Sequence, residues 1–286
     1  MLTRFSWLAA VSILCVSISP AEEFKLPCAV LPSPLDEIRN TDLEIDQVCG
    51  FEGNHNNERK RLENRAKNDF CATNTPIAIN FGVLRRLQEN ADKRADDIKK
   101  ELKASRKILR SMTTHNGEEI GEGTLVRLVA FLHRAKHSNV GKKKPPRKEG
   151  EAVNCNRPQR EFNDIHIELV RKANEHNACN SVTAEISPHF RPDSWDRIVK
   201  LHLHGRPLRI TGPLFFDSSH HPCRPGEKAS PQRMSVWEIH PVYNIEVCKN
   251  TSLGSCKMDV NAHWTPLHEW EEEGEDEEEP DEPPAA

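Results

Sequence analysis

The sequence contains none of the short motifs that mark the common catalytic and cofactor-binding sites. It has no G-x-S-x-G turn for a serine nucleophile, no glycine-rich phosphate loop and no H-E-x-x-H zinc motif. No two cysteines occur as C-x-x-C, the spacing that a zinc cluster would favour. Function must therefore be argued from side chains that only the fold can bring together.

Long hydrophobic runs are almost as scarce. The run at residues 5–16 follows Arg4 and precedes the small-residue site Ser19-Pro20-Ala21, which is the pattern of a secretory signal peptide. A permanent membrane helix takes about 20 apolar residues. We therefore expect residues 1–21 to be removed and the mature chain, secreted or periplasmic, not to be inserted stably in a membrane.

Cysteine is present in an even number once the signal peptide is set aside. Eight cysteines in an exported chain favour a disulfide framework, whose pairing the sequence leaves open. They are Cys28, Cys49, Cys71, Cys155, Cys179, Cys223, Cys248 and Cys256.

Charge is distributed unevenly along the chain. The formal net charge is −4, but 11 carboxylates fall within residues 269–282, so the rest of the chain is basic. Only 36% of the residues are hydrophobic, which indicates that much of the chain lies outside a core. We expect residues 249–286 to form a tail that is acidic and disordered from about residue 269.

The amino-terminal region shows no sustained strand pattern. Residues 22–80 are polar and contain three of the cysteines, which predicts a loop-rich segment ahead of the main domain. Residues 81–112 place leucine and isoleucine at spacings of three, four or seven between charges. This spacing predicts a charged helix.

Five later stretches have the composition and alternation of half-buried strands. They lie at residues 124–135, 163–170, 181–187, 207–217 and 235–248. A short helix capped by Asp193 is expected between the third and the fourth. This order predicts a mainly β domain at residues 124–248, a five-stranded barrel like the OB-fold, with a small β-sandwich as the alternative. Gly212 predicts a bulge or a close approach, and Pro241 predicts an edge position or a bulge.

Five short segments of this domain form a recognisable set. They are GEAVNC at residues 150–155, NDIHIEL at 163–169, AEISPH at 184–189, LRITGPLFFD at 208–217 and WEIHPV at 237–242. Together they resemble a group of exported bacterial proteins, most of them uncharacterised, with a weaker echo in KNDFC at residues 67–71. The resemblance implies a secreted, barrel-like domain but supplies no activity, so no catalytic residue is carried over.

Acidic and imidazole side chains share one face of the predicted barrel. In an OB-like barrel the second, third and fifth strands are neighbours, so their outward residues would form one patch. Two imidazoles and four carboxylates suit a divalent metal, or acid–base chemistry if one carboxyl has a raised pKa. The alternative is a set of cross-strand pairs that keeps the outer surface soluble. The members are Asp164, His166, Glu168, Glu185, Glu238 and His240.

A second candidate is the loop at residues 217–221, which follows the fourth strand. Asp217 and His220 at a strand end could bind an ion or a substrate. The alternative is a turn in which Asp217 bonds its own backbone. The candidate metal ligands are therefore His166, Glu185, Asp217, His220 and His240.

A third candidate is the basic linker between the first and second strands. Its positive charge would attract an anionic polymer, and in an OB-fold this loop lines the ligand site. Few aromatic residues accompany it, so base stacking has little support, and a solvated linker is the alternative. Its candidate binding residues are Lys142, Lys143, Lys144 and Arg147.

These features predict a secreted binding module for an anionic polymer, either nucleic acid or acidic glycan. The alternative is a metal-dependent hydrolase of the phosphodiesterase type that uses the patch and a divalent metal. No catalytic residue is assigned, and the sequence leaves the oligomeric state open.

Overall fold

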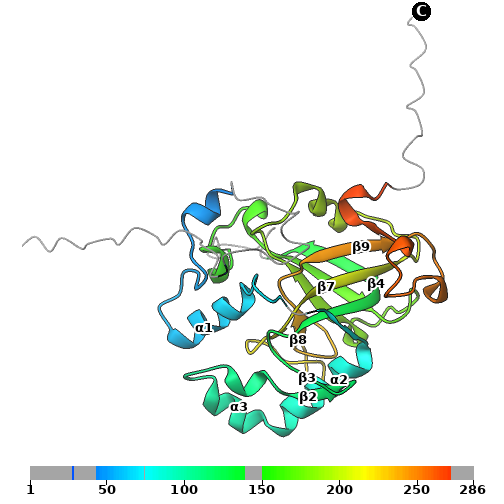
Figure 1. Cartoon of the computed structure of the whole chain (residues 1–286). Helices are drawn as coiled ribbons and strands as arrows, with labels where there is room; N and C mark the ends of the chain where they lie inside the picture. The colour runs from blue at the N-terminus through cyan, green and yellow to red at the C-terminus, as the bar shows by residue number, and fades with distance from the viewer. Residues whose placement is uncertain (1–27, 29–42, 74, 139–149, 272–286) are drawn as a thin grey trace, which may run out of the picture.

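The computed structural model describes Cys28 and residues 43–73, 75–138 and 150–271. The predicted signal peptide, the basic linker and most of the acidic tail lie outside these residues, so the predictions made for them are not tested. Within the described part, the helices of the amino-terminal region lie beside a β-barrel (Figure 1).

Five strands form a closed barrel, and this part of the fold prediction is confirmed. The strands are β4 (Leu125–His137), β5 (Ile165–Val170), β6 (Val182–Ile186), β7 (Pro207–Phe216) and β8 (Trp237–Ile239). Their order is β4-β5-β6-β8-β7, and β4 also pairs with β7, which closes the ring. β6 and β8 run parallel, whereas the other neighbours are antiparallel. The 3-10 helix η6 (Asp193–Val199) lies between β6 and β7 in the chain.

Apolar side chains alternate toward the inside of the barrel. Ile165 lies opposite Ile186 across β5 and β6, and Leu214 lies opposite Ile239 across β7 and β8, all fully buried in one core. Because side chains alternate along a strand, the residues between them point to the outside of the barrel. That outer set carries most of the charge on these strands.

The stretch at residues 235–248, predicted as one strand, forms two. β8 ends before Pro241, which has no N–H to donate to a neighbouring strand, and β9 (Asn244–Cys248) begins after it. β8 and β9 pair with successive parts of β7, and β10 (Trp264–Pro266) extends the sheet beyond β9. The close approach predicted at Gly212 is confirmed, because a Cβ there would lie 2.5 Å from the Pro241 carbonyl oxygen.

The amino-terminal region differs most from its prediction. The segment expected to be loop-rich contains η1 (Glu44–Gln47), α1 (Glu58–Lys67) and β1 (Ile77–Ile79), and β1 pairs with β4. The helix expected at residues 81–112 is divided at Arg94 into α2 (Phe81–Lys93) and α3 (Ala95–Glu101). The hairpin of β2 (Thr113–His115) and β3 (Glu118–Ile120) follows. The other 3-10 helices described are η2 (Lys107–Leu109), η3 (Ala152–Asn154), η4 (Arg160–Phe162), η5 (Ala178–Asn180), η7 (Leu253–Ser255), η8 (Asn261–His263) and η9 (Leu267–Glu269).

Four disulfides link all eight cysteines of the expected mature chain. The pairs are Cys28–Cys71, Cys49–Cys155, Cys179–Cys223 and Cys248–Cys256. They confirm the predicted framework and indicate an oxidising environment, extracellular or periplasmic. Among the described residues, no helix combines the length and apolar character needed to cross a membrane.

We expect Gly212→Ala to lower the free energy of unfolding by about 1–3 kcal/mol, because the added methyl group would overlap the Pro241 carbonyl. Urea unfolding followed by tryptophan fluorescence measures the change. Gly254→Ala is the matched control, since the nearest atom to its Cβ would be 3.8 Å away. Equal stability of Gly212→Ala and the parent would contradict the close approach.

Candidate functional site

The strand register collects acidic and imidazole side chains on the outer face of β5, β6 and β8. His166 lies opposite Glu185 across β5 and β6, and Glu238 lies on β8, the next strand. Asp164 directly precedes β5 and His240 directly follows β8. The second, third and fifth strands of the barrel are therefore neighbours, as the sequence analysis expects.

This face is buried, whereas the alternation along the strands predicts an outward-facing patch at the surface. The end of α1 and the residues after it cover the face. The Lys67 carbonyl accepts a hydrogen bond from Nδ1 of His240 at 2.8 Å, and the Asp69 carbonyl accepts one from the Tyr243 hydroxyl at 2.5 Å. The prediction of an exposed patch is wrong because the covering segment comes from a distant part of the chain.

Three buried side chains form the centre of the site. Nε2 of His240 lies 3.3 Å from Oδ2 of Asp164 and 3.1 Å from Oε2 of Glu185. One ligand atom from each residue lies within 4.8 Å of the other two. A carbonyl oxygen only accepts, so the bond to Lys67 places a hydrogen on Nδ1 of His240 and leaves Nε2 facing both carboxylates. We call Asp164, Glu185 and His240 the central triad.

The second oxygen of each triad carboxylate has its own partner. Oδ1 of Asp164 accepts a hydrogen bond from the Asn154 amide at 3.0 Å, and Oε1 of Glu185 lies 3.2 Å from Nε2 of His166. His166, a predicted metal ligand, thus contacts Glu185 from outside the triad. Asp164, which the list of predicted ligands omits, takes its place.

Lys67 also belongs to the site, although the sequence did not predict this. Its ammonium lies 3.4 Å from Oε2 of Glu185 and 5.6 Å from the centre of the Phe215 ring. Burial alone would lower the pKa of Lys67, but the charges of Glu185 and Glu151 raise it well above its ordinary value. The only sequence signal was the KNDFC segment, which gave no reason to place this lysine beside the barrel.

Opposite charges keep the triad carboxylates ionised and the imidazoles protonated. Burial alone would raise the pKa of Asp164, but the hydrogen bond and charge of His240 lower it to about 2. Burial alone would lower the pKa of His240, but hydrogen bonds to Asp164 and Glu185 raise it to about 10. Against the same effect of burial, the charge of Glu185 raises the pKa of His166 to about 9. Near pH 7 the site is therefore a network of alternating charges.

The site reaches solvent through three side chains. The side chains of His166, Lys67 and Glu151 are 19%, 17% and 13% exposed, whereas those of the triad are almost completely buried. Glu151 accepts a hydrogen bond from the Ser138 hydroxyl at 2.9 Å and lies 3.8 Å from His166. These side chains define the opening of the site.

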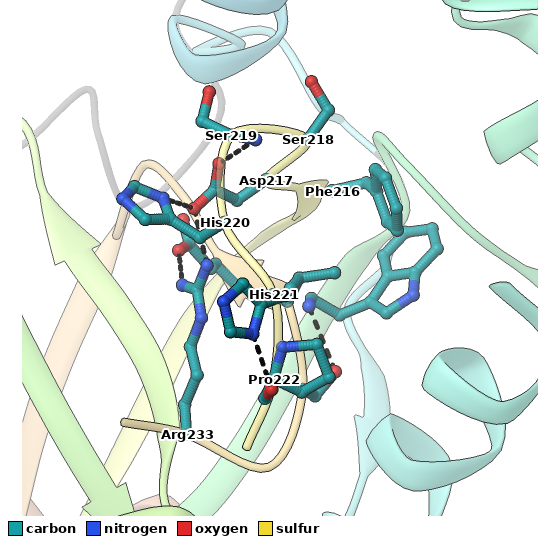
Figure 2. A network of polar contacts seen from close by, with 12 residues as sticks. Phe216, Asp217, Ser218, Ser219, His220, His221, Pro222 and Arg233 are labelled. Carbon is teal, nitrogen blue, oxygen red and sulfur yellow. Dashed lines mark hydrogen bonds and ion pairs between the residues drawn. The ribbon is translucent and has the colours of Figure 1, made fainter. Parts of the chain in front are cut away.

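The loop after β7 holds a second charged cluster. Figure 2 shows Asp217 between Ser219, His220 and Arg233; its carboxylate lies 2.5 Å from Nδ1 of His220 and 2.5 Å from Nη2 of Arg233. Arg233 also pairs with Glu238. Asp217 and His220, both predicted metal ligands, therefore pair with each other outside the triad, and Asp217 also pairs with Arg233.

Two further carboxylates of the predicted patch have separate environments. Burial and the charge of Glu185 raise the pKa of Glu238 to about 7, against the effect of Arg233. Glu238 thus has a raised pKa, but it is almost fully buried and paired with Arg233. Glu168 pairs instead with Arg134 at 2.5 Å, at the next cross-strand position along β5.

Comparisons of the chain with models of protein families, with curated proteins and with solved structures find no match. The resemblance to exported bacterial proteins therefore stays a prediction. What the protein does has to be argued from its fold and from the site alone.

We expect the free energy of unfolding of the metal-free protein to fall as the pH rises above neutrality. Both imidazoles have pKa values in the folded state, about 9 and about 10, that exceed the value of about 6.5 expected for an unfolded chain. The stability that the two protonated imidazoles contribute is complete below the pKa of the unfolded chain. It is lost as the pH rises through their pKa values in the folded state. Urea titrations over this range, with a chelator present, measure the change.

His166→Gln should reduce this dependence on pH, because one of the two imidazoles is removed. His176→Gln, at an exposed loop position, is the control and should leave it unchanged. A parent protein that is equally stable near pH 6 and near pH 9 would argue against protonated imidazoles in the network.

Proposed function

We propose that the protein is a divalent-metal-dependent hydrolase that acts on phosphodiesters. The observation that carries the proposal is the central triad, in which one imidazole nitrogen and two carboxylate oxygens lie within 4.8 Å of one another. Three protein ligands leave positions on an ion for water and substrate, as in catalytic metal sites. A divalent ion held there would polarise a phosphoryl oxygen and lower the pKa of water.

The donor set and its surroundings fit such an ion. Ions of borderline softness accept both nitrogen and oxygen ligands. The bonds from His240 to the Lys67 carbonyl and from Asn154 to Asp164 orient these ligands, which is the usual role of the groups around a metal site. Binding would release the proton from Nε2 of His240, because a ligating imidazole must be deprotonated there.

The side chains at the opening suit a phosphate ester. Lys67 places a positive charge beside Glu185, where it can hold a phosphate oxygen. His166 lies at the same opening, with Nε2 between Glu185 and Glu151, and can exchange a proton with a leaving oxygen. The burial of the triad excludes bulk water, which strengthens every charge interaction in the site.

We further propose that the barrel has OB-fold topology. Three features support this: the strand order, the parallel pairing of β6 with β8, and the position of η6 between β6 and β7. OB-folds bind nucleic acids and oligosaccharides on the face of their second and third strands. The triad lies on that face, formed here by β5 and β6, but the end of α1 covers it, so a polymeric substrate would have to reach the triad past Lys67 and His166.

Metal analysis of the mature protein, together with an assay on bis(p-nitrophenyl) phosphate, tests the hydrolase. We expect stoichiometric binding of Mn²⁺ or Zn²⁺, and hydrolysis that a chelator abolishes. His240→Ala and Glu185→Gln should each weaken metal binding and hydrolysis by about tenfold or more, because each removes a ligand.

His176→Ala is the matched control and should keep both properties. Glu185→Gln preserves the shape of the side chain, so a loss in this variant separates metal binding from folding. The proposal fails if the parent binds no divalent ion, or if hydrolysis persists unchanged without His240.

Lys67→Gln tests whether the ammonium and the ion share Glu185. Removing a positive charge 3.4 Å from a ligand oxygen should tighten metal binding by about tenfold, because the two cations repel each other. Hydrolysis should become slower, since the substrate phosphate loses a partner. Isothermal titration calorimetry measures the affinity, and an unchanged or weaker affinity would show that the two cations do not compete.

A further inference from the structure

A cavity of about 650 Å³ lies beside the barrel where the pairing of β4 with β7 stops. The last residue pair between these two strands is Phe131 with Pro207. From there to its end at His137, β4 pairs with β5 alone among the described strands. The chain at residues 198–206 lines the other side of the cavity, with the buried side chains of Ile198 and Leu203 among its apolar atoms. The cavity thus follows an edge of β4 that the barrel leaves unpaired.

Among the described residues, the charged side chains that line this cavity are all basic. None of the described residues that line it carries a carboxylate, although the whole chain has a net charge of −4. Arg206 is held in place, because it donates a hydrogen bond to the Lys249 carbonyl at 2.6 Å and lies 5.3 Å from the Trp270 ring. The basic and imidazole residues of the lining are His133, Arg134, Lys200, His202, His204 and Arg206.

Positive side chains continue from the cavity to the opening of the site. Arg134 lines the cavity, and Lys136, two residues further along β4, lies directly opposite His166. Residues two apart on a strand share a face, so both side chains lie on the same outer face as the triad. They are 56% and 47% exposed, and both lie near Glu168, at 2.5 Å and 3.9 Å, so a bound phosphate would share them with that carboxylate. A chain of phosphates could therefore follow basic groups from the cavity to His166.

We propose that this cavity and the row formed by Arg134 and Lys136 bind the phosphate backbone of a single-stranded nucleic acid and lead it to the central triad. The proposal rests on the proposed hydrolase and names its substrate. Arginine guanidinium groups match phosphate in geometry as well as charge. The Trp270 ring packs on Arg206 outside the residues that line the cavity, so the choice of nucleic acid over acidic glycan rests on the match between guanidinium and phosphate.

Fluorescence anisotropy of a labelled oligothymidylate tests this proposal, with a chelator present so that the strand is not cut. We expect affinity to fall as salt rises. Lys200→Glu should weaken binding by about tenfold and reduce the salt slope by about 0.7 for each lost phosphate contact. His204→Asn should weaken it less, and asparagine tolerates the positive φ of 46° at this position.

Lys228→Glu makes the same charge change at an exposed lysine outside the cavity and should have little effect. Equal weakening by Lys200→Glu and Lys228→Glu would overturn the proposed site. Tighter binding of heparin than of the oligonucleotide, with the same response to Lys200→Glu, would overturn nucleic acid in favour of a glycan.

The two assays, run on the same parent protein, separate this inference from the hydrolase. Oligonucleotide binding that depends on Lys200, in a protein that never hydrolyses bis(p-nitrophenyl) phosphate, would leave the binding site standing and refute the hydrolase. Hydrolysis of bis(p-nitrophenyl) phosphate by a protein that binds no oligonucleotide would support the hydrolase and refute the proposed binding site.

Discussion

Charged groups that leave water must meet opposite charges or hydrogen-bond partners, and this requirement organises the contact between α1 and the barrel. Lys67 lies against Glu185, and His240 lies against both triad carboxylates. Burial costs several kcal/mol for each ion before attraction compensates, and apolar residues of similar size would stabilise such a contact equally well or better. A contact built from charges is thus poorly explained by stability and is typical of a functional site.

The amino-terminal region is fixed on the barrel by several different interactions. The disulfide Cys49–Cys155 joins it to the loop before β5, and His189 pairs with Asp46 in the interior. The Tyr243 hydroxyl bridges the Asp69 carbonyl and the Ala72 amide. Since these contacts surround the triad, α1 is part of the site as well as its cover. The proposed chemistry depends on this arrangement, because Lys67 at the end of α1 lies against Glu185.

The barrel strands could be predicted because alternation of apolar and polar residues is a local property. The same alternation places His166, Glu185 and Glu238 on neighbouring outward positions once the strand order is assumed. Alternation was misleading at Pro241. Ile239 and Tyr243, on either side of it, both fall at apolar positions of one alternating pattern, which predicts a single strand. In the structure the chain forms two strands there, which pair with different parts of β7.

Burial of the polar face could not be predicted, because its cover is a helix that ends about a hundred residues before β5 in the chain. Lys67 shows the difficulty most clearly, since nothing near it in sequence indicates a contact with Glu185. The composition of the triad also depends on side-chain positions. Asp164 precedes its strand and still reaches His240, whereas Asp217 is engaged by Arg233 instead.

The central claim is that Asp164, Glu185 and His240 bind a divalent ion beneath the end of α1. Anomalous diffraction from crystals of the mature protein grown with Mn²⁺ tests this claim most directly. The account predicts an anomalous peak within coordinating distance of all three side chains, with His240 still bonded to the Lys67 carbonyl through Nδ1. Density for the Lys67 ammonium against Glu185, with no anomalous peak at the triad, would contradict it.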